Sequence, residues 1–132
     1  MIKPLKQTDY AVTKQLFQSV FAMSERPHFV VAWANREPTS TLGVWYRGVL
    51  VGAAIVAGNR LEYIFIHDNF RGGGTGTQLL KAVIATCPNI HLTPVVDPAV
   101  KAWYMRNGFH VSLTCGEYEV FVRHTHNTRN KE

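Results

Sequence analysis

The sequence predicts one mixed α/β (α+β) domain built around a sheet of mostly antiparallel strands. A hairpin signal at Arg47-Gly48 separates two β-rich runs, a strand–glycine loop–helix unit spans residues 60–87, and two strands close the chain. A chain of 132 residues can bury one hydrophobic core and is too short for two ordinary domains. We therefore expect one domain over residues 1–123 and a polar tail over residues 124–132, in which His124 and His126 have no role.

The first elements are a short strand at residues 2–5 and a helix that Thr8 and Asp9 can cap. Apolar residues at helical spacing are expected to form one buried stripe on this helix: Val12, Leu16, Phe17, Val20 and Phe21. Residues 24–41 contain two prolines around an apolar patch, so a short second helix and a loop both remain open.

The centre of the sheet is expected between residues 42 and 67. Strands at 42–46 and 49–57 flank the hairpin turn, and a third strand covers 60–67. In this third strand Leu61, Tyr63 and Phe65 alternate with Glu62, Ile64 and Ile66. Both sets are largely apolar, which indicates burial on both faces.

The second half of the chain alternates helices and strands. Apolar residues repeat at helical spacing from Leu79 to Cys87, and a strand follows at 90–96. Pro98 can occupy the first turn of a helix in which Trp103 belongs to the core, and Asn107-Gly108 ends this helix. Strands at 109–113 and 118–123, joined around Cys115-Gly116, complete the fold.

Composition excludes several classes of protein. The net charge is +5, but the basic residues are scattered, so we expect no nucleic-acid partner. The start of the chain lacks the apolar run of a signal peptide, and no stretch approaches the ~18 apolar residues of a membrane span, so a cytoplasmic protein without a membrane partner is expected. Cys87 and Cys115 match no metal-binding spacing, and we expect neither a metal site nor a disulfide.

The glycine-rich loop at residues 71–76 is the clearest candidate site. Several glycines between a buried strand and a helix let the backbone approach a ligand and direct free N–H groups at it. Because these donors lie at the positive end of the helix dipole, the expected ligand is an anion. Neither the P-loop motif nor the dinucleotide GxGxxG motif fits the loop.

Two groups of residues carry a resemblance to a known family. Arg71, Gly74 and Gly76 form the first, and the second follows downstream: Asp97, Val100, Trp103, Tyr104, Gly108 and Phe109. At these spacings the sequence resembles the GCN5-related N-acetyltransferase (GNAT) superfamily, with Asp97 where the family often has Asn and Val100 where it often has Ala. The resemblance implies a mixed, mostly antiparallel sheet of six to seven strands with about four flanking helices.

The resemblance also implies a cofactor site for acetyl-CoA. Its pyrophosphate would lie on the backbone amides of the loop, which are those of Arg71, Gly72, Gly73, Gly74, Thr75, Gly76 and Thr77. Its pantetheine arm would pair with the main chain at Phe65 and Ile66, and Asp97 and Tyr104 occupy further cofactor positions of the family.

By the same resemblance, Tyr104 would be the general acid that protonates the departing thiolate. An amine acceptor is mostly protonated at neutral pH, so a base is also required. The candidates are Glu62, His67, His91 and Glu117, of which Glu62 and His91 are favoured. Ile90 and Leu92 are expected to face the core, which turns His91 to the other face of its strand.

The predicted function is acetyl-CoA-dependent acetylation of a primary amine. The acceptor stays open between a small polyamine-like or amino-sugar molecule, a protein N-terminus and a lysine side chain, and residues 24–36 and the last hairpin near Glu117 would select it. The alternative is a CoA-binding regulatory or sensor domain that has lost turnover, although retention of Tyr104 favours the enzyme. A homodimer is compatible with the sequence.

Overall fold

The computed structural model describes residues 1–123, and the fold is built from short elements in that range. The strands are β1 (Ile2–Pro4), β2 (Leu42–Tyr46), β3 (Val49–Ala57), β4 (Arg60–Ile66), β5 (His91–Leu92), β6 (Phe109–Cys115) and β7 (Tyr118–Arg123). The helices are α1 (Tyr10–Val20), α2 (Arg26–Ala34), α3 (Thr75–Thr86) and α4 (Pro98–Arg106). Short 3₁₀ turns lie ahead of the first three helices at Gln7–Asp9, Met23–Glu25 and Asp68–Phe70.

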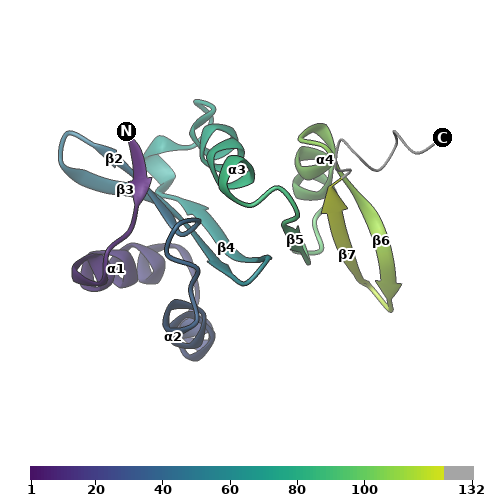
Figure 1. Cartoon of the computed structure of the whole chain (residues 1–132), viewed down its shortest axis with the longest axis horizontal. Helices are drawn as coiled ribbons and strands as arrows, with labels where there is room; N and C mark the ends of the chain where they lie inside the picture. Colours follow the sequence, from purple (N-terminus) through teal and green to yellow (C-terminus); the bar gives the residue numbers. More distant parts are fainter. Residues whose placement is uncertain (124–132) are drawn as a thin grey trace.

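The strands form one sheet in the order β1-β2-β3-β4-β5-β7-β6 (Figure 1). Each neighbouring pair is antiparallel except β4 and β5, which are parallel. This confirms the expected mixed, mostly antiparallel sheet with about four helices. The β2–β3 hairpin turns at Arg47 and Gly48, whose φ angles of 51° and 79° are typical of a tight hairpin.

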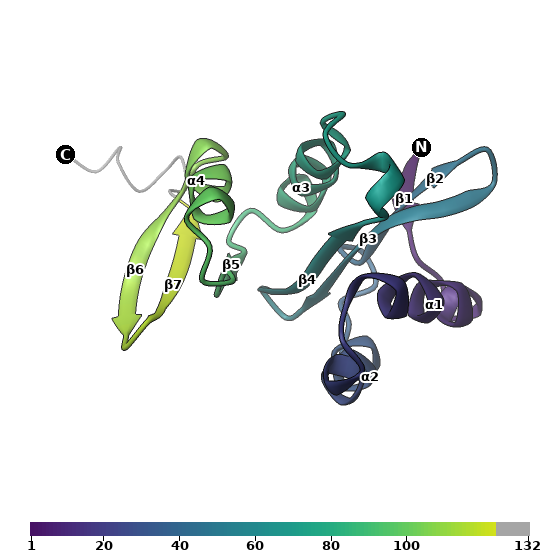
Figure 2. The same cartoon turned by 180° about the vertical axis from the view of Figure 1, so that it is seen from behind.

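The sheet separates two hydrophobic cores. Helices α1 and α2 cover one face, where their apolar side chains pack with Phe65 of β4: Leu16, Phe17, Phe29 and Trp33. Helices α3 and α4 cover the other face, where Leu79, Leu80, Val83 and Tyr104 pack with Ile66 of β4. Figure 2 shows the two helical layers from behind. Strand β4 therefore contributes side chains to both cores.

The sheet opens between β4 and β5. A single pair, Arg60 with His91, joins the two strands, and the ribbons diverge beyond it (Figure 1). The expected strand over 90–96 is wrong in length, because β5 covers only His91–Leu92. The residues after Leu92 cannot continue hydrogen bonding to β4, because β4 diverges from them and Pro94 has no backbone N–H.

Two details of the first half differ from the sequence prediction. In α1 the exposed fraction of Val12 is 36%, whereas Thr13 is fully buried and donates its hydroxyl to the Asp9 carbonyl. Asp9 precedes α1, but its carboxylate accepts from the Lys6 amide instead of capping the helix, because the preceding 3₁₀ turn uses it. Of the two alternatives for residues 24–41, the helix is correct, and Pro27 lies in the first turn of α2.

Candidate active site

The glycine loop connects β4 to α3. Gly72 and Gly74 have φ angles of 87° and 82°, a left-handed conformation that favours glycine, and Gly74 immediately precedes α3. Gly73 has no positive φ, and a Cβ there would meet no atom within 4 Å. Neither backbone conformation nor internal packing therefore requires glycine at position 73. The surface at this position, beside the start of the helix, is open.

The start of α3 presents backbone donors to this open surface. The first hydrogen bond of the helix runs from the Gln78 amide to the Gly74 carbonyl at 3.0 Å, so the amides of Thr75, Gly76 and Thr77 precede the helical ladder. The Arg71 amide differs, because it donates to the Asp68 carbonyl at 3.3 Å. The geometry suits an anion at the helix N-terminus.

The side chain of Arg71 fixes the loop to the end of β4. Its Nε donates to the Ile66 carbonyl at 3.1 Å, and its Nη2 lies 3.2 Å from Asp68 Oδ1. Both partners belong to the strand end or to the 3₁₀ turn that follows it. The Arg71 side chain thus holds the loop in place.

One edge of β4 is open where the sheet divides. The His67 amide donates to Val51 of β3 at 2.8 Å, and backbone groups alternate between the two edges of an antiparallel strand. Phe65, paired with Ala53, therefore directs its backbone groups at β3, whereas Ile64 and Ile66 direct theirs at the open edge. Of the two residues expected to pair with pantetheine, Ile66 has its backbone groups on that edge.

Tyr104 lies in the core between α4 and the sheet, with an exposed fraction of 6%. Its ring contacts Trp103 at a centroid distance of 4.8 Å and the edge of Phe109 at 5.5 Å. Burial raises the pKa of the Tyr104 phenol above its ordinary value. The hydroxyl therefore stays protonated at neutral pH.

Trp103 connects the helix of Tyr104 to the glycine loop. Its Nε1 donates to Thr77 Oγ1 at 2.9 Å, and a Cβ on Gly76 would lie 3.7 Å from Trp103 Cζ2. Trp103 also packs at the border of the core, as its helical position predicted. This contact brings the two groups of residues singled out in the sequence into one region.

Asp97 occupies the position before α4. Its carboxylate accepts a hydrogen bond from the Ala99 amide at 2.9 Å, and Pro98 follows in the first turn. Aspartate is among the preferred residues at this position because its carboxylate satisfies an unpaired amide. The helix start thus gives Asp97 a structural role.

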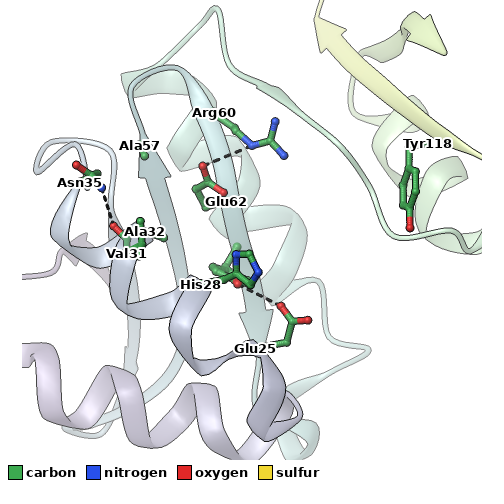
Figure 3. A pocket seen from close by; sticks show the side chains of 10 residues that line it. Glu25, His28, Val31, Ala32, Asn35, Ala57, Arg60, Glu62 and Tyr118 are labelled. Carbon is green, nitrogen blue, oxygen red and sulfur yellow. Dashed lines mark hydrogen bonds and ion pairs between the residues drawn. The ribbon is translucent and has the colours of Figure 1, made fainter. Parts of the chain in front are cut away.

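A second part of the candidate site lies on the α2 side of the sheet. A cleft of about 750 Å³ is lined from three separate segments, by Glu25, His28, Val31, Ala32, Asn35, Ala57, Arg60, Glu62, Tyr63 and Tyr118. Figure 3 shows Tyr118 of β7 across the opening of the sheet from the other labelled side chains. The segments expected to select an acceptor, residues 24–36 and the last hairpin, both contribute to this lining.

A β-bulge brings Glu62 into the cleft. Tyr63 pairs with Ile55 and Leu61 with Val56, which leaves Glu62 without a partner on β3. The predicted alternation is wrong here, because Leu61 packs with Ile64 in the α3-side core. The extra residue of a bulge places two successive side chains on the same face of the sheet and reverses the alternation beyond it. Glu62 and Tyr63 therefore both line the cleft.

Hydrogen bonds and charge organise the polar part of the cleft. Glu62 Oε2 lies 3.5 Å from Arg60 Nε, and the Tyr63 hydroxyl donates to Glu25 Oε1 at 3.3 Å. Burial, followed by the charges of Glu25 and Glu62, raises the pKa of Tyr63 to about 12. Sequence reasoning missed Arg60 and Tyr63 as site residues because only the bulge reveals which face they share.

The other predicted base candidates lie elsewhere. His91 is half-buried between Ile90 and Leu92, both of which face the core as expected, and it is not part of the cleft lining. His67 follows β4 and accepts at Nδ1 from the Asn69 amide at 3.1 Å. Glu117 is exposed in the turn before β7. Of the four candidates, Glu62 is the one in the cleft.

The described chain offers few other sites. No group of three or more metal-ligating side chains occurs within residues 1–123, and no helix in that range is long and apolar enough to cross a bilayer. Cys87 is buried and Cys115 exposed, and both are free thiols.

Comparison with known proteins adds information on ancestry and fold. A family model described as "Acetyltransferase (GNAT) domain" matches residues 25–111. No curated protein sequence matches the chain significantly. A GNAT family acetyltransferase from Elizabethkingia anophelis with acetyl-CoA bound has a TM-score of 0.74 at 13% identity, with 95% of this chain and 97% of that one covered.

Two further solved structures are similar. The PaiA N-acetyltransferase from Thermoplasma acidophilum in complex with coenzyme A has a TM-score of 0.67 at 14% identity, covering 95% of this chain and 98% of that chain. A ribosomal-protein-alanine N-acetyltransferase from Escherichia coli has a TM-score of 0.75 at 18% identity, covering 96% and 97%. At such identities the similarity is evidence for the fold alone.

Proposed function

This chain belongs to the GNAT acetyltransferase domain family, and from that premise we propose that it is an acetyl-CoA-dependent N-acetyltransferase that modifies a primary amine. The observation that carries the proposal is the arrangement around β4. Its open edge runs from the end near the start of α3, where backbone amides precede the helical ladder, to a polar cleft on the opposite face, at Glu62. A cofactor and an acceptor can thus approach one opening in the sheet from its two sides.

The residues around the glycine loop fit acetyl-CoA, which supplies an activated acetyl thioester. The amides from Gly72 to Thr77 would hold the pyrophosphate at the positive end of the α3 dipole. The open edge would pair with the amide groups of the pantetheine arm through the backbone of Ile64 and the amide of Ile66, since the Ile66 carbonyl already accepts from Arg71 Nε. Support comes from two structurally similar proteins, which were solved with coenzyme A and with acetyl-CoA.

The proposed chemistry is direct transfer. Glu62, the candidate base in the cleft, first accepts one proton from the acceptor ammonium, directly or through water. The neutral amine nitrogen then attacks the thioester carbonyl carbon, the carbon–sulfur bond breaks, and the nitrogen releases its second proton to water. Tyr104, held protonated by burial, donates to the sulfur as negative charge develops there.

A free-thiol release assay with acetyl-CoA and a panel of amines and peptides tests the proposal. Tyr104→Phe should lower kcat by about 10²-fold or more if the hydroxyl assists the sulfur. Tyr46→Phe is the matched control, since Tyr46 is half exposed on β2 and outside the site. Absence of thiol release with every acceptor would refute the enzyme, and acetyl-CoA binding without turnover would favour the sensor alternative.

The anion-binding role of the loop needs its own variants. Gly73→Glu adds a negative charge at a position without positive φ or close neighbours, so the backbone is not strained. Gly73→Ala adds a methyl group without charge and is the matched control. We expect Gly73→Glu to weaken acetyl-CoA binding about tenfold or more and Gly73→Ala to weaken it little. Equal affinity of the two variants, measured by calorimetric titration, would contradict the loop as the phosphate site.

A further inference from the structure

The cleft beside α2 contains two carboxylates in unequal surroundings. Glu62 is paired with the Arg60 guanidinium. Glu25 accepts a hydrogen bond from the Tyr63 hydroxyl, and among residues 1–123 it forms no ion pair. Since a neutral hydroxyl does not cancel a carboxylate charge, the uncompensated negative charge of the cleft resides at Glu25.

The two carboxylates occupy different places in the cleft. Glu62 extends from the bulge of β4, beside the opening of the sheet, and Glu25 extends from the 3₁₀ turn before α2. Figure 3 shows Glu62 beside Arg60 and Glu25 apart from that pair, beyond His28 in this view. The Tyr63 hydroxyl, whose pKa burial raises, remains a donor and fixes the position of the Glu25 carboxylate.

We propose that Glu25 determines acceptor choice, and that the cleft takes a primary amine with a second cationic group that binds at Glu25 while the reacting amine lies near Glu62. This inference rests on the proposed function, because it assigns the acceptor of the same reaction. The whole chain has a net charge of +5, which opposes the approach of a cation. The preference for a cation must therefore come from the local arrangement of the cleft.

The same arrangement disfavours an acidic acceptor. A carboxylate in place of the second cation would face Glu25 with like charge, and Arg60 is already engaged by Glu62. The cleft volume of about 750 Å³ lies within the range of small-molecule sites. A free diamine and a peptide with a basic residue beside its terminal amine supply the same chemistry, and the experiment distinguishes these sources.

The test compares kcat/KM for three acceptors of similar length: diaminobutane, butylamine and γ-aminobutyrate. We expect diaminobutane to exceed butylamine by roughly three- to fivefold, the size of a partly exposed ion pair, and γ-aminobutyrate to be the poorest. Glu25→Gln should bring the ratio of diaminobutane to butylamine close to one. Glu37→Gln, an identical change at an exposed residue outside the cleft, should keep the wild-type ratio.

A charge reversal guards against a variant that loses activity for structural reasons. Glu25→Lys should invert the order and make γ-aminobutyrate better than diaminobutane, which misfolding cannot produce. A parallel pair of peptides, with lysine or norleucine after the terminal residue, identifies the source of the second cation. If the lysine peptide is preferred over the norleucine peptide while diaminobutane is not preferred over butylamine, the natural acceptor is a peptide. That outcome still supports the role of Glu25.

Binding measurements separate this inference from the proposed function. Diaminobutane and butylamine are titrated calorimetrically into protein saturated with CoA, with and without Glu25→Gln. If no acceptor is acetylated, the proposed function fails, while the two affinities still decide the role of Glu25. If amines are acetylated but no cationic acceptor is preferred, or the preference survives Glu25→Gln, the inference is overturned and the proposed function stands.

Discussion

Thr77→Val tests the contact that ties α4 to the start of α3. The change removes the Oγ1 acceptor 2.9 Å from Trp103 Nε1 and nearly conserves the volume of the side chain. Losing a partner costs about 1–3 kcal/mol, and because Trp103 is only half-buried we expect about 1–1.5 kcal/mol of unfolding free energy. In a chain of 132 residues, each kcal/mol corresponds to about 4 °C. The melting temperature should therefore fall by about 4–6 °C.

Calorimetric melting of a double-mutant cycle measures this contact. Thr77→Ser keeps the acceptor oxygen and should lose much less stability. Trp103→Phe removes the donor, so adding Thr77→Val to it should cost less than Thr77→Val costs alone. If Thr77→Val melts with the wild type, or if the two changes are additive, the hydrogen bond does not stabilise the junction between the helices.

Three further predictions concern the site. Burial raises the pKa of Tyr104, so as the pH rises above ~10 the phenol ionises first in the unfolded chain. The folding free energy that depends on this proton is therefore complete below pH ~10 and declines above it. Tyr104→Phe should flatten the alkaline decline in melting temperature. Asp97→Ala should cost ~1 kcal/mol in denaturant unfolding by removing the cap of α4, while Asp97→Asn should cost little because asparagine caps equally well. Glu62→Gln should lower kcat about 10²- to 10⁴-fold in thiol release without preventing acetyl-CoA binding, and an unchanged kcat would exclude Glu62 as the base.

The features predicted correctly from sequence depend on local signals. Gly48 favours the positive φ of the hairpin turn after Arg47, and the glycines mark the connection between β4 and α3, although the helix begins at Thr75, inside the predicted loop of residues 71–76. Pro98 and Asn107-Gly108 delimited α4 within one residue, because helix starts and ends have strong residue preferences. These elements can be predicted without knowing which distant residues they contact.

The features that sequence reasoning missed depend on distant partners. The bulge at Glu62 exists only in the register between β3 and β4, and nothing within 60–66 marks it. The length of β5 is limited by the divergence of β4, which the local pattern does not record. Asp97 is an exception, because its hydrogen bond to Ala99, two residues on, is a local helix-cap signal that matching by family spacing overlooked.

The bulge has a consequence for how β4 serves both faces of the sheet. With strict alternation, Glu62 would project with Ile64 and Ile66 into the apolar core under α3, where an unpaired carboxylate is costly. The extra residue instead turns Glu62 to the α2 side, beside Tyr63, while Leu61 completes the core under α3. Within the segment from Glu62 to Ile66, the strand therefore directs a carboxylate to the α2-side face. The open backbone edge of the same segment leads toward the glycine loop. A deletion of Glu62 would restore regular pairing and leave Leu61 opposite Val56 in the α3-side core, so it would remove the carboxylate and the bulge together. Glu62→Gln is for this reason the informative variant: it removes the charge and keeps the bulge.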